Sequence, residues 1–285
     1  MKNSIGNNVS ITLFGESHGD AIGAVLDGIA PGITVDREFI AKQLNLRKPI
    51  GEISTPRKES DDFRILSGVF EGKTTGTPIC ILIPNADTRS KDYSATRYLA
   101  RPSHADYTAN CKYHGYEDYR GGGHFSGRIT AAIVAAGGIV MPALLKKGIK
   151  IGTHVKKCAG ISDRDFSDNI LNEIDSLYEK KFAVLDDEIG GKMIEAITKA
   201  KSEGNSVGGI LETVITGLDA GIGEPMFDTV EGMLAHALYA IPGIKGVEFG
   251  AGFSIADMTG KEANDSFYAL NGEILTKTNN AGGIN

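Results

Sequence analysis

RPSHADYTANCKYHGYEDYRGGGHFSGRIT, residues 101–130, is the stretch around which the rest of the chain is organised. Its three consecutive glycines, Gly121, Gly122 and Gly123, free the backbone from Cβ sterics, so that it can take positive φ or pass close to a ligand. An apolar run over residues 129–145 follows and predicts a helix. A glycine loop that opens a helix is an anion site, because free N–H groups and the positive end of the helix dipole face outward. We therefore expect a phosphorylated ligand at this loop.

Basic residues add full charges to that expectation. Arg101, Arg120 and Arg128 belong to the same stretch, and a guanidinium group binds phosphate or carboxylate oxygens in a two-pronged fashion. A second basic cluster lies upstream and consists of Arg47, Lys48, Arg57 and Lys58. Two readings of it stay open: a solvated surface paired with the carboxylates of Glu52, Glu59 and Asp61, or contacts to a ligand with several anionic groups.

Ser17 and His18 follow the apolar, strand-like run of residues 9–14, in the sequence GESHG. Adjacent residues on a strand project to opposite sides, so we do not expect the two side chains to pair. The spacing also differs from the G-x-S-x-G nucleophile elbow. His18 remains a candidate general acid or phosphate contact, because its ordinary pKa lies near neutrality, or else a structural histidine of the turn.

His104 and Asp106 form a second candidate pair, in which the carboxylate orients the imidazole or both bind a metal. A metal site needs further ligands at suitable spacing, and the sequence shows no such ligands nearby, so we expect no metal. His154 and His236 lie among apolar residues of a predicted strand and a predicted helix, and both are interpreted as structural.

Nucleotide motifs are excluded at the glycine loop. Residues 122–127 fit the beginning of a P-loop, but Arg128 and Ile129 stand where Lys and Ser or Thr are required, and no apolar strand precedes them. Ser126 likewise breaks the G-x-G-x-x-G dinucleotide pattern, and no NADPH fingerprint is visible.

Composition limits the function classes. The 285 residues carry a formal net charge of −6, which disfavours a general nucleic-acid binder. The three cysteines, Cys80, Cys111 and Cys158, are odd in number and lack metal-site spacing, which is typical of reduced thiols in a cytoplasmic protein. The N-terminus has no apolar signal region and no span of 18 apolar residues is evident, so we expect neither secretion nor membrane insertion.

The periodicity predicts an α+β protein. Strands are expected at 9–14, 21–26, 63–70, 77–83, 151–155, 208–217 and 247–253. Helices are expected at 37–46, with Asp36 as N-cap, and at 129–145, 187–203 and 229–240. Some strands are adjacent, which favours α+β layers over a doubly wound sheet, and no linker forces a division of residues 1–285 into separate domains.

The motifs GESHG, RPSHADYT, KYHGYEDYRGGGHFSGR and GEPMFD occur in this order, and with them the chain resembles the chorismate synthase family from about residue 9 to its end. The resemblance implies a β-α-β sandwich with helices between antiparallel sheets, assembled as a homotetramer. It implies a carbon–oxygen lyase that uses reduced FMN to convert 5-enolpyruvylshikimate 3-phosphate into chorismate and phosphate. This trans-1,4-elimination, the last step of the shikimate pathway to aromatic amino-acid precursors, involves no net redox change. An external flavin reductase is the implied partner.

The same resemblance assigns roles to residues. His18 would protonate the departing phosphate, with Ser17 beside the flavin, and His104 would donate toward the N1 side of the reduced flavin. The cofactor positions are His124, Phe125, Ser126 and Arg128, and the substrate positions are Arg47, Arg57 and Arg120. A second family arginine has no counterpart, because Glu52 or Ile53 stands in its place, and its role passes to Arg57 or is missing.

Family members continue beyond the AGGI sequence with a segment that carries an aspartate assigned to proton abstraction, and the sequence ends at Asn285 before it. We therefore expect these 285 residues alone to be poorly active or inactive. The alternative from another class is a chain that binds flavin or phosphate without turnover, which flavin binding without phosphate release would reveal.

Overall fold

The structure is a computed structural model that describes residues 2–55, 59–86, 93 and 97–283. Two compact units make up the chain, Met1–Leu218 and Asp219–Asn285. The expectation of a single domain over residues 1–285 stays a prediction, and each unit is described here by itself.

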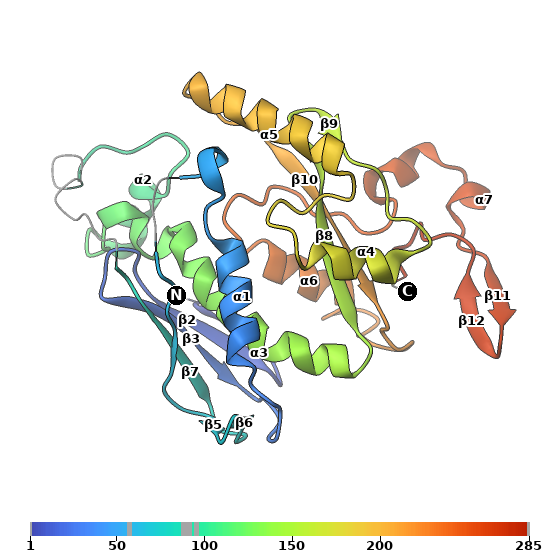
Figure 1. Cartoon of the computed structure of the whole chain (residues 1–285), viewed down its shortest axis with the longest axis horizontal. Coiled ribbons are helices and arrows are strands. Elements are labelled where there is room, and N and C mark those ends of the chain that lie inside the picture. The colour runs from blue at the N-terminus through green and yellow to red at the C-terminus, as the bar shows by residue number, and fades with distance from the viewer. Residues whose placement is uncertain (1, 56–58, 87–92, 94–96, 284–285) are drawn as a thin grey trace. The chain divides into compact units, whose positions relative to one another are not determined.

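A five-stranded antiparallel sheet forms the N-terminal part of the first unit, and Figure 1 shows it in blue and teal. Its order is β1 (Ser4–Gly6), β2 (Ser10–Gly15), β3 (Ala21–Asp27), β7 (Ile79–Pro84) and β4 (Arg64–Ile65). Two short strands, β5 (Val69–Phe70) and β6 (Lys73–Thr74), pair beside it. Side chains alternate across a strand, and accordingly residues 22, 24 and 26 of β3 and 79, 81 and 83 of β7 are buried on one face.

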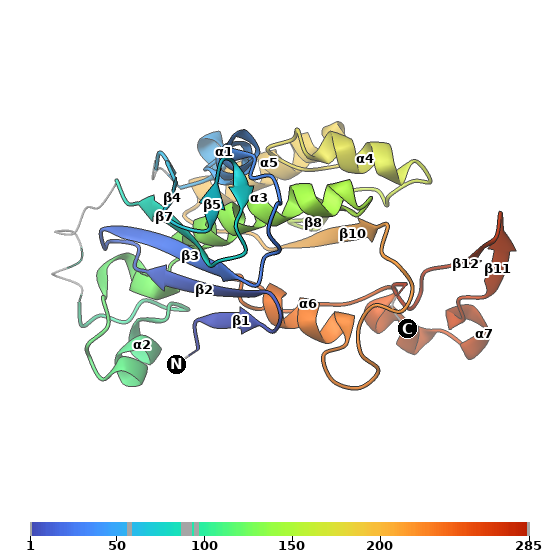
Figure 2. The ribbon, with the colours of Figure 1, turned by 90° about the horizontal axis from the view of Figure 1, so that it is seen from below.

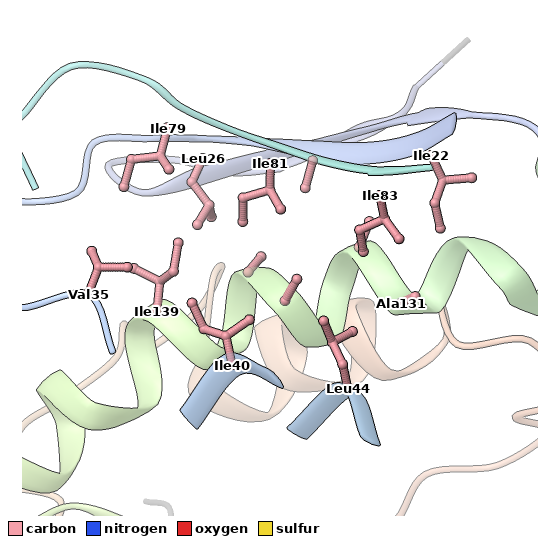
Figure 3. Packing of buried hydrophobic residues seen from close by; sticks show 14 of the residues in the cluster. Ile22, Leu26, Val35, Ile40, Leu44, Ile79, Ile81, Ile83, Ala131 and Ile139 are labelled. Atoms are coloured by element: carbon pink, nitrogen blue, oxygen red, sulfur yellow. The ribbon is translucent and has the colours of Figure 1, made fainter. Parts of the chain in front are cut away.

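Two helices cover that buried face. Asp36 caps α1 (Arg37–Arg47) by accepting a hydrogen bond from the Phe39 amide at 2.9 Å, as the sequence predicted. Helix α3 (Thr130–Lys146) packs on β3 and β7, and α1 packs on α3 (Figure 2). Figure 3 shows α3 between the isoleucines of the sheet on one side and Ile40 and Leu44 of α1 on the other. The core therefore fixes where α3 begins, next to the glycine loop.

By length and composition, residues 127–146 are apolar enough to span a membrane, so the expectation that no such span exists was wrong. The core helix of a soluble protein meets the same criterion. Ala131, Ala132, Ala135 and Ile139 of this helix are buried in the core against β3 and β7. Pro142 lies inside α3, which continues past it to Lys146.

A second antiparallel sheet has the order β10 (Gly209–Thr216), β8 (Lys150–Cys158) and β9 (Ile161–Ser162). Helix α4 (Ile170–Leu177) packs on β8, where Ile174 is fully buried against Gly152. Helix α5 (Asp187–Ser202) begins at the N-cap Asp186 and buries Met193. His154 of β8 is fully buried, and its Nδ1 and Nε2 lie 2.8 Å from carboxylate oxygens of Asp163 and Glu212. The interpretation of His154 as structural is confirmed.

The second unit contains α6 (Val230–Leu238), the 3-10 helix η5 (Gly252–Asp257), α7 (Gly260–Ala263) and the hairpin β11 (Phe267–Leu270) with β12 (Glu273–Thr276). The strand predicted over residues 247–253 was wrong. Gly250 and Gly252 both have positive φ, and a Cβ on Gly250 would lie 2.1 Å from the Asn280 carbonyl oxygen. His236 of α6 is exposed, and its interpretation as structural stays a prediction.

The structure is thus an α+β fold whose strand pairs are antiparallel throughout the described residues.

Candidate functional site

The turn that carries Ser17 and His18 follows the end of β2. Gly15, at φ +93°, takes the chain out of the strand, and the amide of Gly19 closes the turn on the carbonyl of Glu16 at 3.1 Å. Within the turn, Ser17 Oγ lies 2.9 Å from His18 Nδ1. The prediction that these side chains diverge was wrong, because it assumed strand geometry where the backbone turns. Both residues are buried.

Ser17 settles the proton arrangement at His18. Its hydroxyl donates to the carbonyl of Arg120 at 3.3 Å. A tautomer with the proton on His18 Nδ1 satisfies both contacts, because Nδ1 then donates to Ser17 Oγ while the hydroxyl donates to the carbonyl. Proton exchange with a substrate therefore falls to the other ring nitrogen, Nε2.

The glycine loop lies against this turn. Gly121, Gly122 and Gly123 have φ values of +60°, +93° and +54°, as the sequence predicted for a loop of three glycines. The Gly123 carbonyl accepts from the Ser17 amide at 3.1 Å. A Cβ on Gly121 would lie 2.1 Å from Cε1 of His18, so only glycine leaves room for the imidazole.

Residues 124–126 continue the loop into the helix start. His124 Nδ1 lies 2.7 Å from the carbonyl of Gly15, which only accepts, so this nitrogen carries a proton. Ser126 Oγ accepts from the Arg128 amide at 3.3 Å, and Phe125 is 43% exposed. Gly122 and Gly127 have no atom within 4 Å of an added Cβ. Exposed aromatic surface beside open backbone fits a planar ring, so these residues fit a flavin.

Arg128 is buried, and its guanidinium holds three segments together. Its Nε donates to Asn85 Oδ1 at 3.0 Å, one NH2 group donates to the Pro84 carbonyl at 3.3 Å, and the other pairs closely with Asp61.

Arg47 lies nearby, with its Nε 3.2 Å from Thr130 Oγ1 and its guanidinium 3.6 Å from Asp61. Two predicted arginines therefore meet on one buried carboxylate at the start of α3.

The other two arginines of the loop region have carboxylate partners of their own. Arg101 donates twice to Asp106, at 2.7 and 2.9 Å, and the hydrogen bond from its side chain lowers the Asp106 pKa to about 2. Arg120 pairs with Asp118 at 2.7 Å. Burial alone would raise the pKa of Asp118, but hydrogen bonds from Arg120 and the nearby charge of His18 lower it. The positive charges of Arg101 and Arg120, which a phosphate could use, are therefore partly neutralised by these aspartates.

Both oxygens of Asp106 accept from Arg101, and the nearby charge of His104 also lowers the Asp106 pKa, so the orientation of His104 by Asp106 stays a prediction. His104 is exposed and precedes α2 (Asp106–Tyr113), whereas His18 is buried under the glycine loop. Arg57 lies outside the described residues. In the part of the chain that the structure describes, no group of three His, Cys, Asp or Glu side chains could hold a metal ion.

Asn85, immediately after β7, was missed. Its side chain donates to the carbonyls of Glu16 and Gly19, at 2.9 and 2.8 Å. The sequence did contain one signal for it. Asn85 is a polar residue directly after a strand-like run, and such residues lie at the edge of a sheet, where functional side chains are often found.

Comparison with known proteins agrees with this geometry. A sequence model of the chorismate synthase family matches residues 9–285. The chorismate synthase of Pyrococcus abyssi (strain GE5 / Orsay) is 47% identical over 279 residues, which cover 98% of this chain and 77% of that protein. The chorismate synthase of Methanosarcina mazei (strain ATCC BAA-159 / DSM 3647 / Goe1 / Go1 / JCM 11833 / OCM 88) is 44% identical over 284 residues, which cover 99% of this chain and 77% of that protein.

A solved structure described as a crystal structure of chorismate synthase has the same fold. It superposes with a TM-score of 0.78 at 28% identity and covers 96% of this chain and 79% of its own. Both the fold and the sequence motifs that surround the Ser17–His18 turn are therefore those of one family. The chain belongs to the chorismate synthase family.

Proposed function

We propose that the turn of Ser17 and His18, together with the glycine loop over it, is where this chain eliminates phosphate from 5-enolpyruvylshikimate 3-phosphate to give chorismate. The family consists of carbon–oxygen lyases of the shikimate pathway and uses a flavin cofactor. In the reaction a C–O bond to phosphate breaks and a proton leaves a carbon of the same ring, so atoms balance without net oxidation. The observation that carries the proposal is the bonded Ser17–His18 pair beneath Gly121.

His18 would supply the proton that the departing phosphate takes. Ser17 occupies Nδ1, so delivery would use Nε2. Arg47 and Arg120 lie at the two sides of the loop, where their guanidinium groups would stabilise the charge of the leaving phosphate. Arg57 and His104 keep their predicted roles as a substrate residue and a flavin residue.

The flavin would be held by His124, Phe125, Ser126 and Arg128. We propose that it is FMN in its reduced form, whose electron-rich ring assists departure of the phosphate. Phe125 would offer ring contact, and the open backbone at Gly122 and Gly127 would allow close approach. His124 would orient the loop through its bond to Gly15. Arg128, already committed to Asn85 and Asp61, would act mainly through the geometry of the loop.

Three further features are part of the proposal: cytoplasmic location, supply of reduced flavin by an external reductase, and a homotetrameric assembly. Support for assembly comes from unit Asp219–Asn285, where large apolar side chains stay exposed, among them Met226 at 78%, Phe227 at 85% and Ile274 at 77%. Exposed apolar surface of this kind is typical of interaction sites. Light scattering on the purified chain measures the assembly directly.

The test is a single-turnover assay under anaerobic conditions, with enzyme in excess over substrate and dithionite-reduced FMN. Excess enzyme makes even a slow chain measurable. We expect chorismate and phosphate in equal amounts, with the flavin still reduced at the end. Flavin binding without phosphate release would instead support the alternative of a binding chain without turnover.

A further inference from the structure

Asn85 uses its whole side-chain amide to hold the turn that carries Ser17 and His18. Its two Nδ2 hydrogens serve two carbonyls, those of Glu16 at 2.9 Å and Gly19 at 2.8 Å. These two residues flank the Ser17–His18 pair on either side. The Asn85 backbone amide also donates to the carbonyl of Asp20 at 3.0 Å. One residue thus satisfies three carbonyls of a single turn.

The orientation of this amide is fixed by Arg128. The guanidinium Nε can only donate, and it lies 3.0 Å from Asn85 Oδ1, so the oxygen of the amide must face Arg128 and the nitrogen must face the turn. Arg128 is itself fixed by Asp61 and by the Pro84 carbonyl. A rigid chain of contacts therefore runs from the start of α3 through Asn85 to the turn.

The glycine loop also holds the turn. The Ser17 amide donates to the Gly123 carbonyl, and the His18 ring lies against Gly121 with no space for a Cβ. Asn85 holds the carbonyls of Glu16 and Gly19. With both sets of contacts in place, the Ser17–His18 bond keeps one geometry.

We infer that Asn85 is a positioning residue that sets the orientation and tautomer of His18 by holding the carbonyls of Glu16 and Gly19. The inference rests on the proposed role of His18 as the proton donor. A shift of about 1 Å in a reacting group can cost on the order of a hundredfold in rate. Loss of the Asn85 contacts should therefore reduce the rate far more than it weakens substrate binding.

The discriminating substitution is Asn85→Asp. Aspartate keeps an oxygen acceptor for Arg128 but has no side-chain N–H for the two carbonyls. It therefore removes the side-chain hydrogen bonds to the turn and keeps the one to Arg128. Asn85→Leu removes both contacts. The matched control is Asn172→Asp on α4, whose exposed amide donates to Asn169 Oδ1 at 2.7 Å, away from the turn.

Two readouts are measured on the 285-residue chain: single-turnover chorismate formation with KM for the substrate, and 15N NMR of the histidine rings, with His18 assigned from the spectrum of His18→Asn. We expect Asn85→Asp and Asn85→Leu each to lower the turnover rate at least tenfold, with KM changed less than threefold. The neutral His18 ring should lose its preference for a protonated Nδ1. Asn172→Asp should match the wild type in both readouts.

The outcomes separate this inference from the proposed function. An unchanged His18 tautomer in Asn85→Asp overturns the inference, whether the turnover rate is that of the wild type or lower. A changed tautomer with an unchanged rate supports positioning and contradicts the role of His18 in turnover. If neither variant folds, hydrogen exchange of the wild-type Asn85 side-chain amide decides, and exchange as fast as that of Asn172 overturns the inference.

Discussion

At Gly121, a methyl group and the imidazole of His18 would compete for the same space. Gly121→Ala places a Cβ 2.1 Å from His18 Cε1, whereas Gly122→Ala meets no atom within 4 Å. Both positions have positive φ, so both variants carry backbone strain of about 1 to 3 kcal/mol. We predict that only Gly121→Ala displaces His18 and lowers the single-turnover rate at least tenfold relative to Gly122→Ala. Equal rates in the two variants would show that the ring does not need this space.

The Arg101–Asp106 pair predicts a pH-dependent contribution to stability. The Asp106 pKa falls from its ordinary 3.8 to about 2 in the folded chain, chiefly through the hydrogen bond from Arg101. A lowered folded-state pKa stabilises the protein above the unfolded value, and this stability is lost as pH falls from about 4 toward 2.

Asp106→Asn should therefore lower the free energy of unfolding at pH 7 by about 1 kcal/mol, a value that allows for solvent screening of a half-exposed pair. The difference between wild type and Asp106→Asn should shrink as the pH is lowered toward 3. Denaturant unfolding at several pH values measures it. A difference that stays constant with pH would rule out the ionised carboxylate as its source.

The sequence predicted which residues gather at the site better than it predicted how they contact each other. The glycine loop, His18 and Arg128 were singled out from residue type, and the structure brings them close together, whereas Arg57 lies outside the described residues. The Ser17–His18 bond was missed, because strand geometry was extended past Gly15, where φ is +93°. The pairing of Arg128 with Asn85 joins residues 43 positions apart, and no local pattern encodes such a contact.

At the scale of elements, the two central glycines of α3 differ in their surroundings. A Cβ on Gly138 would lie 3.0 Å from Cγ1 and 3.2 Å from Cα of Ile40 on α1, whereas a Cβ on Gly137 meets nothing within 4 Å. Glycine in a helix costs about 1 kcal/mol relative to alanine. Gly137→Ala should therefore stabilise the chain by up to about 1 kcal/mol.

For Gly138→Ala we predict no gain or a net loss, because α1 would have to move away from α3. Thermal unfolding of both variants provides the measurement. If Gly138→Ala stabilised the chain as much as Gly137→Ala does, α1 could move away from α3 at little cost in free energy, and the prediction would be wrong.

Elements with strong local signals were predictable. Helices α1 and α5 were found because Asp36 caps the first and an amphipathic pattern marks the second, and β3 was found as a short apolar run. The hairpin β11–β12 was missed although Asn271-Gly272, with φ of +52° and +87°, is a typical two-residue hairpin turn. The error at residues 247–253 came from apolar residues among glycines whose positive φ ends any strand.

For the molecule as a whole, the family match over residues 9–285 and the fold comparison agree with the α+β prediction. The first unit has a continuous core between the five-stranded sheet, α1 and α3. In the described part of Asp219–Asn285, no residue is buried. Sequence periodicity could not predict this difference, because it identifies apolar faces without showing what covers them. The homotetramer therefore stays a prediction.

The central claim is that His18 gives a proton to the departing phosphate. The direct measurement is single-turnover chorismate formation with reduced FMN by His18→Asn and by His114→Asn, an exposed histidine with φ of +56° that asparagine tolerates well. We predict a rate at least about a hundredfold below wild type for folded His18→Asn, and a rate within twofold of wild type for His114→Asn. Turnover of His18→Asn at the wild-type rate would contradict the account.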